Sequence, residues 1–309
     1  MSTAAQVPET RELEGDDAVD TLRKTGIGAL LRDSFIRFRF ADGFSHSRAL
    51  AFQLVLAFFP ALIALVALGH ALGQESFSRV ITDTVRELAP GPAGQIVTQA
   101  FEQGTETSDS ATALIAGIFV ALLAASTAMG QIERGSNRIY GVERDRPAVH
   151  KYGRAFALAL SAGLAIALAF VLLVPGSALG GALKGATGWS DALDTAWSVG
   201  RWPLGALLVA IAVTMLFRLS PNRHQPEETW LAFGSGISIL LWFAFTGLLA
   251  LYVSEVQEFG ETYGPLAGVI GVLVWALLTA IALFAGLAVA AQLEAVRAGA
   301  PRPRDGRGG

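Results

Sequence analysis

Long uncharged segments alternate with short charged ones along most of the chain. Six internal segments carry no Asp, Glu, Lys or Arg, and they span residues 49–74, 110–132, 155–183, 202–217, 229–254 and 262–293. A helix that crosses a membrane needs about 20 apolar residues. Five segments reach that length, whereas the fourth has only 16 residues. The pattern predicts an all-α, polytopic membrane protein with six transmembrane helices, at about 49–73, 111–131, 155–180, 202–219, 230–253 and 264–293.

The distribution of basic residues supports the short fourth span. Cytoplasmic loops of membrane proteins carry an excess of Lys and Arg. With six spans, 19 of the 23 basic residues fall on one side of the membrane and 4 on the other. Without the fourth span, this excess would almost vanish. We therefore expect six spans in a bacterial plasma membrane, with both termini in the cytoplasm.

The two ends of the chain differ from its apolar middle. Residues 1–20 hold one basic and six acidic residues and predict a disordered acidic tail, and residues 296–309 predict a flexible basic tail. Within the membrane domain, residues 21–295, the segment 21–44 repeats apolar residues at helical spacing beside several arginines. This pattern is typical of a short interfacial helix. Alternatively, its bases only anchor the first span, and the two interpretations are compatible.

Composition excludes several kinds of active site. Hydrophobic residues make up 52% of the chain and charged residues 16%, against about 25% charged in soluble proteins. The chain has no cysteine, no GxxxxGK[ST] phosphate loop, no HExxH and no GxSxG motif. None of its four histidines lies at metal-ligand spacing from another ligand. We expect no enzymatic activity, no catalytic residue, no metal or cofactor and no nucleic-acid partner.

Three polar or helix-bending residues mark the spans. Pro60 lies in the middle of the first span and predicts a kink. Gln53 lies seven residues earlier on the same face, and a polar amide at membrane depth should point into the bundle. Gln53 therefore either makes an interhelical hydrogen bond or lines a cavity beside a kinked gate. Arg218, at the end of the fourth span, is expected to anchor the helix at the membrane surface or to bind a lipid headgroup.

Small residues recur every four positions in two spans. They are Ala113, Gly117 and Ala121 in the second span, and Ala282, Gly286 and Ala290 in the sixth. Helices in membranes associate largely by close packing of small residues. The pattern predicts tight helix contacts, with hinges as the alternative.

Three ordered motifs stand near the ends of the spans. They are ALAFQ at 49–53 leading to FFP at 58–60, ERGSNRIYGV at 133–142, and LSPN at 219–222 followed by YGPLAGVI at 263–270. On these motifs the chain resembles the YihY / virulence factor BrkB family of bacterial inner-membrane proteins, over roughly residues 30–295. The family usually has Tyr where Phe52 stands and Ser where Ala57 stands. The resemblance implies six helices, a plasma-membrane location and no settled biochemical activity.

Some relatives of this family carry an old label as the tRNA-processing ribonuclease BN. The sequence offers neither a metal site nor a basic nucleic-acid surface beyond membrane anchoring, so we do not expect that activity here. The six bases of the inner loop 131–154 serve either topology or contact with phospholipid or another anionic substrate.

The candidate functional or gating residues come from the spans and from these motifs. They are Gln53, Pro60, Asn137, Gly141, Arg218, Pro221, Asn222, Tyr263 and Gly264. We expect a transporter or lipid-handling permease, with membrane lipids as partners and a lipid or small molecule as substrate. The alternative is a non-transporting envelope scaffold or assembly partner.

Overall fold

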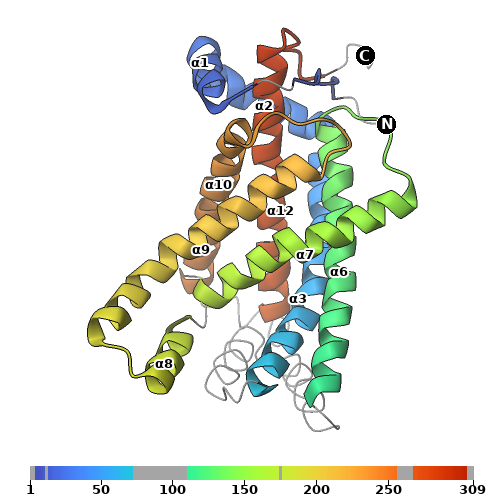
Figure 1. The fold of residues 1–309 in the computed structure, drawn as a ribbon. Coiled ribbons are helices and arrows are strands. Elements are labelled where there is room, and N and C mark those ends of the chain that lie inside the picture. The colour runs from blue at the N-terminus through green and yellow to red at the C-terminus, as the bar shows by residue number, and fades with distance from the viewer. Residues whose placement is uncertain (1–3, 11–12, 72–109, 174–175, 256–266, 305–309) are drawn as a thin grey trace.

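The computed structural model describes residues 4–10, 13–71, 110–173, 176–255 and 267–304. These residues form an all-α structure whose helices are α1 (Gly15–Thr25), α2 (Ile27–Phe40), α3 (Gly43–Ala71), α6 (Ser110–Ile139), α7 (Ala148–Leu173), α8 (Gly176–Thr187), α9 (Asp191–Leu219), α10 (Glu228–Glu255) and α12 (Ala267–Arg297). Figure 1 shows the long helices gathered into a bundle, with α1 and α2 at one end of it.

Five long helices of the described residues are apolar enough to cross a membrane, namely α6, α7, α9, α10 and α12. Their outer faces carry large exposed apolar side chains, including Leu240 at 70% and Leu248 at 63% exposure. Such a surface suits surrounding lipid, because soluble proteins rarely expose large contiguous apolar areas. The predicted all-α membrane protein is confirmed at this level.

Several helix boundaries differ from the expected spans, most clearly those of α7, α8 and α9. The short segment 202–219 lies inside α9, which begins at Asp191 and has 29 residues. Asp191 and Asp194 stand in its first turn, where acids are favourable to the helix dipole. The segment 155–180 is divided between α7, which ends at Leu173, and α8, which begins at Gly176. The sequence has Pro175 between them, and a proline kinks or ends a helix because it lacks the backbone N–H.

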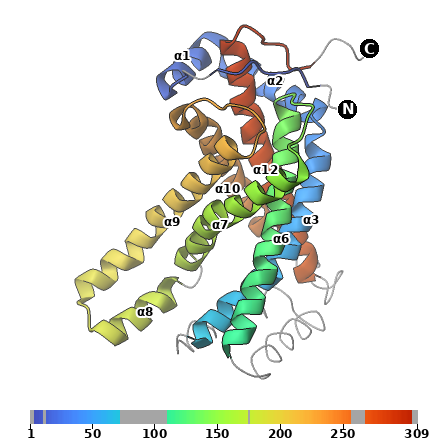
Figure 2. The same cartoon turned by 45° about the vertical axis from the view of Figure 1, so that its right-hand side comes forward.

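The α8 helix and the first half of α9 form a hairpin that projects away from α3 and α6 (Figures 1 and 2). The indole nitrogen of Trp197 donates a hydrogen bond of 2.7 Å to the carbonyl of Gly176. A Cβ atom at Gly180 would lie 2.5 Å from the Trp197 ring. The glycine at 180 therefore lets α9 approach α8 closely.

The α12 helix forms the core of the bundle, with α3, α10 and α2 packed around it. Phe284, Leu287 and Leu293 on this helix are almost fully buried. At its crossing with α10, Gly286 lies so close that an added Cβ would meet the carbonyl of Gly234 at 2.6 Å. The small residues predicted to mediate packing in the last span thus lie at a close helix contact.

The two ends of the described chain meet at one end of the bundle. Ala4 and Arg304 form an isolated antiparallel β-bridge, and Figure 1 shows both termini on that side. Where the sequence predicts a disordered acidic tail, residues 4–10 are extended against the bundle and α1 begins at Gly15. Gly26, with φ of 81°, separates α1 from α2 within the region predicted as one interfacial helix. We call this side of the molecule the terminal end.

Candidate functional site

A group of polar and charged side chains is packed at the terminal end, and we call it the polar cluster. It consists of Arg37, Glu133, Asn137, Asp145, Arg146, Asn222, Arg223, Gln292 and Glu294. They come from α2, α6, α12 and the two connections 140–147 and 220–227. Elements far apart in sequence therefore meet here through polar contacts.

Asn137 links the two inner motifs. It lies in the last turn of α6, because this helix continues to Ile139 rather than ending near residue 131 as expected. Its side chain is fully buried. The Oδ1 atom accepts a hydrogen bond of 2.7 Å from the backbone N–H of Asn222, and the Nδ2 atom donates one of 2.9 Å to Asp145. The Asn137 amide thus satisfies the N–H of Asn222 in one connection and the carboxylate of Asp145 in the other.

Gly141 ends α6 in a left-handed conformation, with φ of 71°. The backbone N–H of Val142 donates a hydrogen bond to the carbonyl of Asn137, and the backbone N–H of Gly141 donates one to the carbonyl of Arg138. This is the hydrogen-bond pattern of a Schellman helix end, in which glycine is the favoured residue. A Cβ at this position would also lie 2.6 Å from Cα of Gln6. The glycine therefore turns the chain and admits the N-terminal segment.

Arg146 ties the connection 140–147 to the connection between α9 and α10. Its guanidinium pairs with the buried Glu133 at 3.1 Å. It also donates hydrogen bonds to the carbonyls of Ser220 and Pro221, at 2.9 Å and 2.6 Å. Removing either partner of such a buried pair is costly, because the other charge would stay buried without compensation.

Arg223 and Glu294 form a second buried ion pair, at 2.7 Å, with side chains 2% and 0% exposed. The Arg223 guanidinium also lies 4.5 Å from the centre of the Tyr140 ring. The hydroxyl of Thr10 donates a hydrogen bond of 2.6 Å to Glu294. This pair joins the last turns of α12 to the connection after α9 and to the N-terminal segment.

The N-terminal segment 4–10 lies across the polar cluster. Its carbonyls at Ala5 and Pro8 accept hydrogen bonds from Arg37 and Arg223, at 2.7 Å and 3.0 Å. The Glu9 carboxylate contacts both the backbone N–H and the ring of His224. The segment therefore supplies acceptors to three basic residues of the bundle.

The surroundings shift the pKa of three groups here. Burial would raise the pKa of Asp145, but the hydrogen bond from Asn137 and the ammonium of Lys151 outweigh burial and lower it. For Glu9, the contacts with His224 and the charge of Arg223 outweigh burial and lower the pKa in the same way. Burial, together with the nearby Glu294, raises the pKa of the Tyr140 phenol far above its ordinary value.

The structure brings together only part of the predicted site. Asn137, Gly141, Pro221 and Asn222 lie within or beside the polar cluster. Arg218 is 49% exposed and forms an ion pair with Glu228 at the start of α10. Tyr263 and Gly264 lie outside the described residues.

Gln53 and Pro60 lie in α3, away from this cluster in sequence. The α3 helix continues on both sides of Pro60. Gln53 is half-buried, and its Oε1 atom is buried without a hydrogen-bond partner among the described residues. The structure thus shows no interhelical hydrogen bond to this oxygen within the part it describes.

The charged core of the cluster was not predicted from the sequence. Glu133 and Glu294 directly flank uncharged segments, and Arg37 and Arg223 lie in charged segments between them, where charges normally face water. Two of these residues could have been noticed from the motifs, because Glu133 is the first residue of ERGSNRIYGV and Arg223 directly follows LSPN. Only the packing of α2, α12 and the N-terminal segment over these residues buries them.

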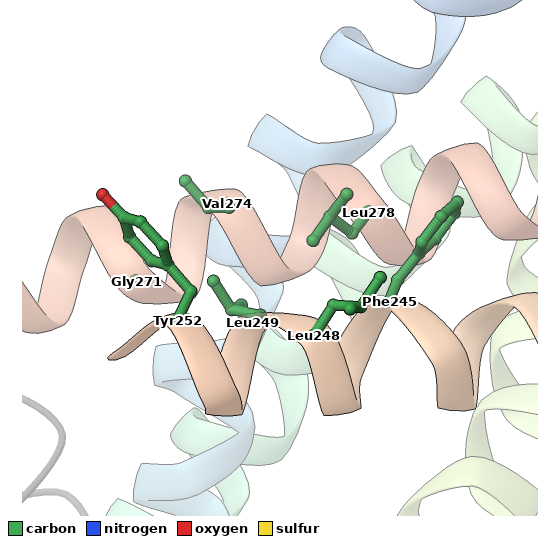
Figure 3. Close-up of a pocket in the computed structure, with 7 residues that line it drawn as sticks. All are labelled: Phe245, Leu248, Leu249, Tyr252, Gly271, Val274 and Leu278. Carbon is green, nitrogen blue, oxygen red and sulfur yellow. The ribbon is translucent and has the colours of Figure 1, made fainter. Parts of the chain in front are cut away.

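An apolar groove lies between α10 and α12 (Figure 3). It has a volume of about 310 Å³ and is lined by residues that include Leu248, Tyr252, Gly271 and Val274.

Within the described segments, no three His, Asp or Glu side chains are grouped so that they could hold a metal ion. The polar chemistry of the described chain is thus concentrated in the polar cluster, which fixes connections between helices.

Comparison with known proteins places the chain among membrane proteins. The family model described as Virulence factor BrkB matches residues 34–307. A Bacillus subtilis protein named as ribonuclease-like, YfkH, is 27% identical over 258 residues, which cover 84% of this chain and 92% of that protein. A UPF0761 membrane protein of Chromobacterium violaceum is 28% identical over 207 residues, covering 64% of this chain and 45% of that protein. No solved structure matches the chain.

Proposed function

The chain belongs to the Virulence factor BrkB family of multi-pass membrane proteins, and from this starting point we propose that it is a transporter or lipid-handling permease. The observation that carries the proposal is the contact of Asn137 with Asn222 and Asp145. It joins two connections that belong to different helix pairs, α6–α7 and α9–α10. Opening this contact, together with the hydrogen bonds of Arg146 to Ser220 and Pro221, would separate the two pairs at the terminal end, as a gate requires.

The amide oxygen of Gln53, which has no hydrogen-bond partner among the described residues, supports the same proposal. A buried polar atom without a partner costs free energy, and polar groups within membrane helices frequently line substrate pathways. Gln53 belongs to α3, which packs against both α6 and α12. A pathway beside α3 would bring a polar substrate group to this oxygen.

The proposal is tested with purified protein in proteoliposomes. Movement of fluorescent phospholipids and of a panel of small solutes is measured for wild type, Gln53→Leu and Asn137→Ala, with Asn222→Ala as the matched control. We expect Gln53→Leu to reduce movement at least several-fold, and Asn137→Ala to alter it more than Asn222→Ala does. Absence of movement of every lipid and solute by folded wild-type protein would contradict the proposal.

We further propose that α3 is a sixth span and that both termini face the cytoplasm of a bacterial plasma membrane. The contact of Ala4 with Arg304 supports an even number of crossings. The excess of basic residues on the side of the termini supports the orientation. Reporter fusions after residues 104, 188 and 257 should then report the outside, and fusions after 145, 224 and 305 the inside.

The projecting hairpin of α8 and α9 favours a second function, that of a membrane scaffold or assembly partner. The α9 helix exposes Val199, Trp202 and Leu207 by more than half of their surface. Another membrane protein would pack against such a face. A photo-crosslinker at Val199 should then give one defined adduct in native membranes, whereas a crosslinker at Leu240 should not.

We also propose that the chain is not an enzyme and does not act on RNA, although the name of YfkH describes that relative as ribonuclease-like. The support is the lack of recognisable catalytic motifs in the sequence. Incubation of the purified protein with labelled tRNA and structured RNA tests this point. Cleavage that is retained through purification and lost on substitution of Glu133 would contradict it.

A further inference from the structure

A second groove lies at the terminal end, between α2 and the segment that follows α12. It has a volume of about 680 Å³ and is lined by Arg32, Asp33 and Phe40 on one side and by residues 301–304 on the other. The side chain of Gln292 donates a hydrogen bond of 2.7 Å to the carbonyl of Pro301. The backbone N–H of Ala5 donates another to the carbonyl of Pro303. These bonds hold the segment in place beside α2.

The groove carries an excess of positive charge. Arg32, Arg302 and Arg304 line it, against the single acid Asp33. Arg32 and Asp33 pair at 3.0 Å, which leaves two guanidinium groups in excess among the described residues that line the groove. The guanidinium of Arg304 lies 5.3 Å from the centre of the Phe40 ring, which orients it along the groove. Guanidinium groups match the oxygens of a phosphate in geometry as well as in charge.

An exposed apolar stripe runs along the same helix. Ile27, Leu31 and Phe35 follow one another at four-residue spacing and are 62%, 49% and 56% exposed. Arg32 follows Leu31 directly and therefore lies between the stripe and the groove on the helix surface. A helix with an apolar stripe and flanking bases binds in the plane of a membrane interface.

If α12 spans the membrane, the position of α2 on its end places both features at the membrane surface. The helix packs on the end of α12 and is followed three residues later by α3. Its stripe can then contact acyl chains while its bases reach the headgroups. A soluble phosphate would use the groove but not the stripe, and so their adjacency favours a lipid.

We propose that this groove binds the phosphate of an anionic phospholipid in the leaflet at the terminal end, with the acyl chains of the lipid along Ile27, Leu31 and Phe35. The site is separate from the polar cluster, and its existence does not depend on the proposed transport function. It would fix α2, and through it α12, relative to the membrane surface.

The test uses native mass spectrometry of the purified full-length protein, titrated with phosphatidylglycerol and, separately, with phosphatidylcholine. Wild type should retain phosphatidylglycerol in preference. An arginine near an anionic surface contributes about fivefold in affinity. Arg302→Gln with Arg304→Gln should therefore weaken retention of phosphatidylglycerol by about fivefold for each arginine removed.

A matched control removes two exposed bases elsewhere, Arg48→Gln with Arg297→Gln, and should leave retention within about twofold. Asp33→Asn should strengthen retention, an effect that misfolding would not produce. Equal losses in the groove and control variants, or no gain in Asp33→Asn, would overturn the proposal. Complete displacement of the lipid by excess inorganic phosphate would also overturn it, in favour of a soluble phosphate ligand.

Discussion

The backbone N–H of Asn222 donates a hydrogen bond of 2.7 Å to the side-chain oxygen of Asn137, which stands 85 residues earlier in the chain. The two residues belong to separate sequence motifs, one at the end of α6 and the other after α9. Buried charges on both sides of this bond, Glu133 with Arg146 and Glu294 with Arg223, join further elements to the same place. The terminal end is thus held together by polar contacts, in contrast to the apolar packing along the helices.

Asn137→Ala should destabilise the protein by about 1–3 kcal/mol, because it leaves the Asn222 amide without its acceptor and removes one of the two donors to Asp145, the other being Lys151. Asn222→Ala should cost less than about 1 kcal/mol, since it removes only an exposed side-chain hydrogen bond to the carbonyl of Arg144 and keeps the backbone donor. Thermal unfolding in detergent, followed by intrinsic fluorescence, compares the two variants. Equal shifts of the unfolding midpoint would contradict this account of Asn137.

Breaking the buried pair of Arg223 and Glu294 should have a larger effect. Glu294→Gln should cost about 3–5 kcal/mol, because the Arg223 guanidinium would stay buried without its counter-charge. The double variant Arg223→Met with Glu294→Leu should recover much of this loss, since neither position then carries a buried charge. The same unfolding measurement gives both values.

The ion pair of Arg218 and Glu228 is the matched control for that experiment. Both side chains are about half exposed or more. Exposed ion pairs contribute between 0 and about 1 kcal/mol. Glu228→Gln should therefore have little effect, and a loss as large as that of Glu294→Gln would refute the assignment of the effect to burial.

The crossing of α10 and α12 depends on glycine at 234 but not at 236. In Gly234→Ala the new Cβ would lie 2.7 Å from the Ala290 Cβ and 2.9 Å from the carbonyl of Gly286. Separating the helices should cost about 1–3 kcal/mol. In Gly236→Ala nothing lies within 4 Å, and the greater helix propensity of alanine should leave stability unchanged or raise it by up to about 1 kcal/mol. A similar loss in both variants would argue against this crossing.

The membrane helices could be predicted from the sequence, since an uncharged segment of sufficient length has few other structures open to it. Their ends could not, because α6 continues through the motif at 133–139 and α9 begins eleven residues before Trp202. Asn137 and Asn222 were identified by their motifs. Glu294 was not, because its burial depends on Thr10 and Arg223, which are distant in the sequence.

The lowered pKa of Asp145 predicts an acid-sensitive contact. A carboxyl group whose pKa is lower in the folded state than in the unfolded state stabilises the fold fully above its unfolded pKa. The pKa of aspartate in an unfolded chain is about 4. The contribution of Asp145 to stability is lost as the pH falls below that value and through the lower pKa of the folded state. The difference in unfolding midpoint between wild type and Asp145→Asn should be constant from pH 7 to about pH 5 and shrink below about pH 4. A difference that does not change with pH would contradict the pairing of Asp145 with Asn137 and Lys151.

Gly141 gives a direct measure of how firmly the N-terminal segment is attached to the polar cluster. Alanine at a positive φ costs about 1–2 kcal/mol, and at position 141 its Cβ would also collide with the backbone of Gln6. Gly188 has a similar φ of 62° with nothing within 4 Å, so Gly188→Ala reports the backbone strain alone. We expect Gly141→Ala to be the more destabilising, and the excess to disappear when residues 2–10 are deleted. If Gly141→Ala remains more destabilising than Gly188→Ala after the deletion, the segment does not lie over Gly141. Two groups in contact have non-additive effects on stability when both are changed in a double-mutant cycle.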